Sequence, residues 1–328
     1  MSKMLMRRRA LGLMAGAPLL SLSAPAFGQG RYPTRPVRFV VPYPPGGATD
    51  VIARMIAEKL TPVWGQPVVV ENRAGAGATL GAEVVARSEP DGYTLFETTS
   101  AHTISKSLYR SLSYDPIRDF TAITLTAIVP LVLVVSKNVP ATSLREFITW
   151  GKAQRQGITF GSTGNGTAQH LTQALFALKA EVRSEHVPYR GDAPLNTDVL
   201  GGLVDASFST LSAVLPYIQS GEMKAIALAH PNRMQAIPNV PTFAEAGMAG
   251  FEAATWFGTF APASLPNDLR EKIARDISAL VADPAFTRRL VEMGGDVTNY
   301  PPARFDQFIA AETARWAEAV RVSGATIN

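Results

Sequence analysis

Residues 120–135 read FTAITLTAIVPLVLVV, and this stretch decides the fold. Apolar and β-branched residues fill it, interrupted by Pro130. Its sixteen residues exceed the usual strand length of about 3–10 residues. We therefore predict a strand that leaves one lobe and enters another. Residues 254–260 have a similar character and predict a second crossing strand.

Outward from residues 120–135, strand-like and helix-like segments alternate in both directions. This alternation predicts an α/β fold with a mostly parallel sheet. The two crossings divide it into two lobes. The segments predicted before the first crossing are strands 37–41, 67–70 and 93–97 and helices 49–60 and 78–87. Those after it are strands 158–160, 206–209 and 224–229 and helices 167–180, 192–201, 267–281, 284–292 and 302–322.

The crossings also predict the domain limits. Residues 29–127 and 255–328 should form a discontinuous first lobe, covered by the last three helices, and residues 128–254 the second lobe. Ligands of open α/β sheets bind beyond the carboxyl ends of the strands, beside helix N-termini. With two lobes, that edge becomes an interlobe cleft.

The first 28 residues are typical of an export signal. Lys3 and the arginines at 7–9 form a basic region, and residues 10–22 are apolar but too short to span a bilayer. Cleavage after Ala26 and cleavage after Gly28 fit equally well. The adjacent arginines suit either the secretory or the twin-arginine route. The mature chain is expected in the periplasm.

Composition excludes several classes of function. The chain has 31 basic and 27 acidic residues, and the leader holds only basic ones, so the mature chain is close to neutral. It shows no basic stripe, and nucleic acid is not an expected partner. The absence of cysteine excludes disulfides, zinc–thiolate sites and cysteine nucleophiles. A core of this size needs no such cross-links.

Two glycine-rich loops precede predicted helices, one in each lobe. Glycine lets the backbone approach a ligand closely, and a helix N-terminus favours an anion. Either loop alone could be an ordinary turn, and Asp50 is expected to cap its helix. The candidate ligand-binding residues are Tyr43, Gly46, Gly47, Ala48, Thr49 and Asp50 in the first loop, and Gly161, Ser162, Thr163, Asn165, Gly166 and Thr167 in the second.

Two further segments supply candidate cleft residues. Residues 186–194 open a helix, and Arg190 there is either a bidentate carboxylate clamp or a solvated surface group. Residues 98–103 end a predicted strand and offer hydroxyl groups. The candidates from these two segments are Thr98, Thr99, Ser100, His102, Arg190, Gly191 and Asp192.

Signals for catalysis are weak. An exported hydrolase using Ser162 or Thr163 with His170 is the alternative function, but a Gly-x-Ser-x-Gly elbow and an identifiable acid are missing. Residues 75–81 approach a dinucleotide fingerprint, with the third glycine one residue late. The four histidines lack metal-ligand spacing. We expect no catalytic residue, metal or cofactor.

Short motifs run in order along nearly the whole chain after the leader. They lie at residues 32–36, 42–50, 70–73, 75–77, 90–94, 113–116, 119–120, 187–191, 200–205, 240–242, 245–247, 256–258, 312, 316 and 323–325. By these motifs the chain resembles the extracytoplasmic solute receptors of tripartite tricarboxylate transporters, also called Bordetella-uptake-type (Bug) receptors. Ala48 and Ala74 depart from the pattern, where glycine and proline are common.

The resemblance implies a periplasmic-binding-protein fold of the type II kind that closes on carboxylates such as citrate, dicarboxylates, acidic amino acids or aromatic acids. Residues 43–50 and 161–167 match the loops that hold the ligand carboxylate, through backbone groups and water. Residues 98–102 and 190–193 match the flanking walls. The implied partner is a membrane permease, and a receptor that serves a sensor kinase instead is the alternative that the sequence leaves open. We expect a monomeric binding protein rather than an enzyme.

Overall fold

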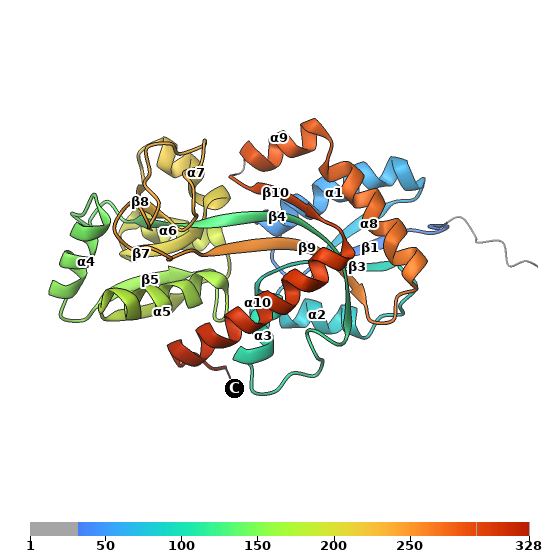
Figure 1. The fold of residues 1–328 in the computed structure, drawn as a ribbon, viewed down its shortest axis with the longest axis horizontal. Helices are drawn as coiled ribbons and strands as arrows, with labels where there is room; N and C mark the ends of the chain where they lie inside the picture. The colour runs from blue at the N-terminus through green and yellow to red at the C-terminus, as the bar shows by residue number, and fades with distance from the viewer. Residues whose placement is uncertain (1–31, 293, 328) are drawn as a thin grey trace, which may run out of the picture.

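Two α/β lobes lie side by side and are joined by long paired strands (Figure 1). The structure is a computed structural model that describes residues 32–292 and 294–327, so the predicted export signal lies outside the described residues. None of the described helices combines the length and the apolar character needed to cross a membrane.

The first lobe begins with a parallel sheet in which β1 lies between β2 and β3. The alternation of apolar strands and amphipathic helices buries Phe39, Val41 and Leu95 against α1 and the C-terminal helices. Its elements are β1 (Val37–Val41), α1 (Ala48–Trp64), β2 (Val68–Asn72), the short 3-10 helix η1 (Ala76–Ala78), α2 (Thr79–Ala86), β3 (Thr94–Thr99) and α3 (Ala101–Leu108).

The strands β4 (Phe120–Val135) and β9 (Ala254–Pro262) run antiparallel through both lobes. Up to Pro130, β4 pairs with β9, and β9 pairs in turn with β3. From Leu131 onward, β4 pairs with β7 and β8 of the second lobe. The two predicted crossing strands are therefore present. The change of partners falls close to the predicted lobe boundary, although the domain limits themselves stay a prediction.

The second lobe repeats the arrangement with β5 between β6 and β7, all parallel. Six phenylalanines, including Phe160, Phe176 and Phe208, form its aromatic core. Its elements are α4 (Leu144–Ala153), β5 (Ile158–Ser162), α5 (Ala168–Ala180), β6 (Ser184–Pro188), α6 (Asp192–Gly201), β7 (Ala206–Thr210), α7 (Leu211–Gln219) and β8 (Lys224–Leu228).

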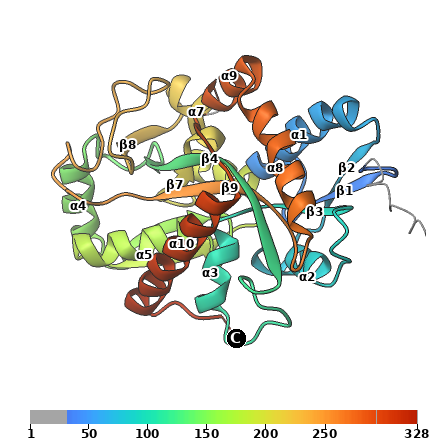
Figure 2. The ribbon, with the colours of Figure 1, turned by 45° about the vertical axis from the view of Figure 1, so that its right-hand side comes forward.

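After β9 the chain returns to the first lobe as α8 (Asn267–Val281), α9 (Pro284–Glu292), β10 (Asp296–Tyr300) and α10 (Pro302–Ser323). The sequence predicted that these helices cover the first lobe, and α10 extends further than predicted, to the second lobe. Phe305 packs on Trp256 in the first lobe, whereas Trp316 and Val320 belong to the core of the second lobe. Figure 2 shows α10 running from above β9 to the side of α5.

Glu312 fastens α10 to the crossing strand. Its Oε2 accepts hydrogen bonds from the indole N–H of Trp256 at 3.1 Å and of Trp316 at 2.8 Å, and the carboxylate is buried. Gly258 leaves room for the helix, because a Cβ there would lie 2.5 Å from Cζ of Phe305. The residues of the motifs at 256–258, 312 and 316 therefore lie together where α10 packs on β9.

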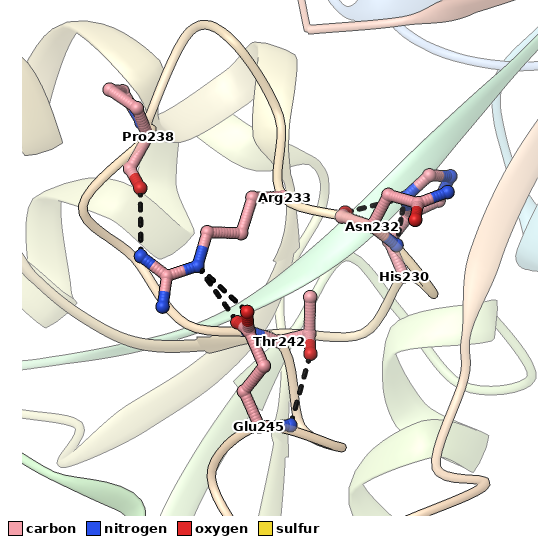
Figure 3. A network of polar contacts seen from close by, with 6 residues as sticks. All are labelled: His230, Asn232, Arg233, Pro238, Thr242 and Glu245. Carbon is pink, nitrogen blue, oxygen red and sulfur yellow. Dashed lines mark hydrogen bonds and ion pairs between the residues drawn. The ribbon is translucent and has the colours of Figure 1, made fainter.

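The segment between β8 and β9 has little regular structure and is held by polar contacts (Figure 3). Arg233 Nε donates to both carboxylate oxygens of Glu245, at 2.8 and 3.1 Å, and Arg233 Nη1 donates to the Pro238 carbonyl. Glu245 accepts from the Thr242 N–H, and Thr242 Oγ1 accepts from the Glu245 N–H. This reciprocal pair is the capping-box pattern, which explains the motif at 240–247.

Removing the Glu312 carboxylate should destabilise the whole molecule. Glu312→Ala leaves two buried indole N–H groups without acceptors, and each such loss costs about 1–3 kcal/mol. We expect the free energy of unfolding to fall by about 3 kcal/mol in urea titrations. Glu318→Ala is the control, because this exposed residue of the same helix pairs with exposed Arg321 and should leave the midpoint unchanged. Equal effects of the two variants would contradict the role of Glu312.

Candidate functional site

A cavity of about 560 Å³ lies between the lobes, beside the crossing strands. Loops from both lobes and β9 form its walls. The lining residues are Tyr43, Pro44, Pro45, Gly46, Gly47, Ala48, Thr49, Val51 and Thr99 of the first lobe, Thr163, Thr167, Ala168, Gln169, Arg190, Gly191, Asp192, Ala193, Pro194, Asn196, Thr210, Ser212, Ala213 and Tyr217 of the second, and Thr255 and Phe257 of β9.

Four helices begin at this cavity. The first residues of α1, α5 and α6, and the N-cap Thr210 and second residue Ser212 of α7, lie in its lining. First-turn N–H groups have no partner within a helix, and the helix dipole places partial positive charge there. The N-cap residues Gly47, Gly191 and Thr210 make no side-chain cap. Amide donors of α1, α6 and α7 are thus left free of side-chain caps at the cavity.

Asp50 holds the first loop in place by hydrogen bonds on the side away from the cavity. Its carboxylate accepts from Gly46 N–H and Arg54 Nε, both at 2.9 Å, and from Asn72 Nδ2 at 2.8 Å. Burial alone would raise the pKa of Asp50, but these hydrogen bonds outweigh burial and lower the pKa. Asp50 therefore stays ionised and anchors the loop. It does not line the cavity, and it does not cap α1 as expected, because the N-cap of that helix is Gly47 and has no side-chain cap.

Tyr43 and Thr99 join two strand ends of the first lobe. The Tyr43 hydroxyl lies 2.7 Å from Thr99 Oγ1, and both residues line the cavity. Burial raises the pKa of Tyr43 to about 12, so its phenol remains a neutral hydrogen-bonding group.

The other candidates from residues 98–103 lie in the core. His102 packs among the rings of Phe96, Phe120 and Phe260, and burial lowers its pKa to about 4. Thr98 is also fully buried, and Ser100 Oγ lies 3.1 Å from Thr255 Oγ1. The structure therefore brings only Thr99 of this segment into the cavity.

The second loop contributes Thr163 and Thr167 to the cavity. Thr167 caps α5 by accepting from His170 N–H. Gly161, Asn165 and Gly166 lie outside the lining. Gly166 is required by the packing, because a Cβ there would lie 2.0 Å from Leu108 Cδ2.

Ser162 and two histidines form a cluster behind this loop. Ser162 is fully buried, and its Oγ lies 2.6 Å from His186 Nε2 and 3.0 Å from the Gly164 carbonyl. The rings of His186 and His170 stack at 3.8 Å, and His170 Nδ1 accepts from Gly166 N–H. The serine meets His186 instead of His170, the partner weighed from sequence. Because Ser162 is enclosed, it cannot reach a ligand in the cavity.

Arg190 and Asp192 are the lining residues with ionisable acidic or basic side chains. Arg190 is exposed, and Asp192 is partly buried at the first position of α6. Burial raises the pKa of Asp192 to about 6, so its carboxylate is ionised at neutral pH. Within residues 32–292 and 294–327, acidic and histidine side chains form no cluster that would hold a metal ion.

One wall of the cavity consists of residues that were not predicted from the sequence. Thr210, Ser212 and Ala213 begin α7, and Asn196 and Thr255 complete this side. The stretch Ser-Thr-Leu-Ser at 209–212 follows a predicted strand directly. The rule that places ligands at strand ends could have identified it.

Comparisons with known proteins agree on one family. The family model "Tripartite tricarboxylate transporter family receptor" matches residues 52–324. Protein BugT of Bordetella pertussis is 37% identical over 299 residues, covering 90% of this chain and 92% of BugT. A UPF0065 protein of Pseudomonas sp. strain P51 is 35% identical, with 94% of this chain and 92% of that protein covered.

Two solved structures have the same fold. Rpa4515 of R. palustris, with adipate, has a TM-score of 0.86 and 33% identity, and the match covers 90% of this chain and 100% of that chain. MatC of Rhodopseudomonas palustris, with bound malate, has a TM-score of 0.83 and 31% identity, covering 88% and 100%. These matches confirm the two-lobe binding-protein fold predicted from sequence.

Acid should weaken the second lobe through the stacked histidines. Burial lowers the pKa of His170, and lowers that of His186 to about 4 with a further contribution from His170. In the unfolded chain both would titrate near about 6.5. Between about pH 6.5 and 4 the unfolded chain binds more protons, so stability falls as pH falls.

His186→Gln should make the free energy of unfolding less dependent on pH in that window. Urea titrations of both proteins at several pH values give the comparison. Parallel pH profiles for the variant and the parent would refute a role for His186.

Proposed function

The chain belongs to the tripartite tricarboxylate transporter receptor family, and we propose that it captures a small organic carboxylate between its lobes for delivery to the permease of such a transporter. Proteins of this family are periplasmic solute receptors. We further propose that the chain is exported and acts as a monomer without catalysis.

The observation that carries the proposal is the meeting of four helix N-termini at one cavity. Each contributes oriented N–H donors, and at α1, α5 and α7 the first-turn residues that line the cavity are neutral, so the positive helix end suits a carboxylate. The donors are main-chain groups fixed by the fold, so little ordering is needed when the ligand binds. Closure of the lobes would exclude water and strengthen these interactions.

The relatives support the same ligand class. Adipate and malate, named for two structures of the same fold, are small carboxylates. A cavity of about 560 Å³ accommodates molecules of this size. We propose that the ligand is held by predicted residues that line the cavity, namely Tyr43, Gly46, Gly47, Ala48, Thr49, Thr99, Thr163, Thr167, Arg190, Gly191 and Asp192.

The hydrolase alternative finds less support in the geometry. Ser162 is buried, and the cavity-facing Thr163 donates its hydroxyl to Gln169 Oε1 at 3.0 Å. A nucleophile needs a base within hydrogen-bond distance and access to the substrate. Neither hydroxyl combines the two, which favours a receptor over a hydrolase.

Carboxylates should stabilise the protein without being consumed. At a concentration of one hundred times Kd, a ligand raises the free energy of unfolding by about 2.7 kcal/mol. Thermal unfolding of the mature chain with a panel of mono-, di- and tricarboxylates, including adipate and malate, should identify ligands. Mass spectrometry of the same samples should recover the acid unchanged. Turnover of an acid would support the hydrolase, and a panel without any stabilising acid would refute the receptor.

A side chain at position 47 should block the first loop. Gly47 has an ordinary φ of −76°, and a Cβ there meets only the Pro44 carbonyl oxygen at 3.9 Å, so the fold tolerates it. Gly47→Val should place its methyl groups in the cavity and weaken carboxylate binding at least about tenfold, or about 1.4 kcal/mol. Gly201→Val is the matched control, since that glycine is exposed at the end of α6, outside the lining. Unchanged binding by Gly47→Val in calorimetry would place the ligand elsewhere.

A further inference from the structure

One wall of the cavity carries an acceptor without a partner. Asp192, the first residue of α6, lines the cavity and is partly buried. Asn196, one turn further along α6, is only 4% exposed. Its Nδ2 donates to the Ala213 carbonyl at 3.0 Å, and its Oδ1 is enclosed by the protein, so this oxygen is out of reach of a ligand. The acceptor that this wall offers to a ligand is therefore the carboxylate of Asp192.

The carboxylate of Asp192 has no partner. Within the described part of the chain it has neither a hydrogen bond nor an ion pair, although Arg190 is two residues away in the sequence. Burial disfavours its charged form, and its negative charge contributes to the raised pKa of Tyr43 across the cleft. A partly buried anion without a partner is unfavourable unless a ligand supplies one.

The other three helix N-termini differ in charge from this one. The first residues of α1, α5 and α7 that line the cavity are neutral: Ala48, Thr49, Ala168, Gln169 and Ser212. Their positive ends attract a carboxylate. At the start of α6, Asp192 opposes that potential. The cavity is therefore bipolar, with an anion-binding side and an acceptor side.

Resting on the proposed function, we propose that Asp192 determines ligand specificity. Its carboxylate forms a subsite for a hydrogen-bond donor, an ammonium or hydroxyl group carried on the carbon next to the bound carboxylate. The two oxygens of the carboxylate can accept two protons of an ammonium group or the single proton of a hydroxyl group. A second bare carboxylate at the same place would face Asp192 and be repelled.

Matched ligand series test this assignment. Succinate, malate and aspartate share one skeleton with hydrogen, hydroxyl or ammonium at the second carbon. Butyrate, 2-hydroxybutyrate and 2-aminobutyrate repeat the comparison with one carboxylate. In calorimetry, a donor-bearing member should bind at least about tenfold more tightly than the bare acid, which corresponds to one hydrogen bond to a charged group. The hydroxyl and ammonium members show which donor is used.

The variant Asp192→Asn keeps the shape of the side chain and removes its charge. It should abolish most of the preference for the donor-bearing acid, while binding of the bare acid is kept or improved. Binding of the bare acid also shows that the variant is folded. The matched control is Asp268→Asn, an exposed first-turn aspartate of α8 outside the cavity, which should keep the preference of the parent.

The outcomes separate the two proposals. If the parent binds bare and donor-bearing acids equally, or if Asp192→Asn keeps the preference, the specificity subsite is refuted and the carboxylate receptor stands. If the parent binds none of the six acids or any wider panel of carboxylates, the proposed function fails, and the subsite fails with it.

Discussion

The antiparallel pairing of β4 with β9 is the constraint on which the rest of the structure depends. These strands extend the sheet of the first lobe, and β4 then enters the sheet of the second. Strand ends from both lobes consequently meet beside the crossing, and the helices that follow them begin at one cavity. Glu312 of α10 binds the same crossing from outside by accepting from the indole N–H of Trp256.

The positive electrostatic potential in the cavity comes mainly from main-chain N–H groups. Helix ends supply the positive potential, while side chains such as Asp50 and Thr167 hold the loops in shape. A main-chain site of this kind fits many carboxylates, because every helix N-terminus presents similar donors. Selectivity must then come from the few side chains that differ in charge or hydrogen bonding. Asp192 stands out for this reason, since it lines the cavity and places a negative charge there, whereas Asp50 at the start of α1 lies outside the lining.

Much of the fold could be predicted from the sequence. Strands such as 37–41 and helices such as 192–201 carry clear apolar patterns, and the observed bounds agree closely. The segments β6 and β10 were missed because their partly exposed residues show no alternating apolar pattern. The helix α7 was not predicted, because Pro216 within it is a residue that usually ends a helix. The path of α10 to the second lobe depends on the packing of Trp316 and Val320 in the core that α5 also lines, and apolar periodicity does not specify which lobe a helix contacts.

The sequence by itself determined the alternation, the two crossings, the glycine-rich loops and the family motifs, because these rest on local backbone preferences and apolar spacing. Which side chains line the cavity is set by the tertiary structure. Thr99 points into the cavity while Thr98 and Ser100 do not line it, and His102, three residues on, is enclosed by aromatic rings. Ser162 turned toward His186 and away from the cleft. Such orientations depend on contacts between residues far apart in the chain, and local sequence preferences do not encode them.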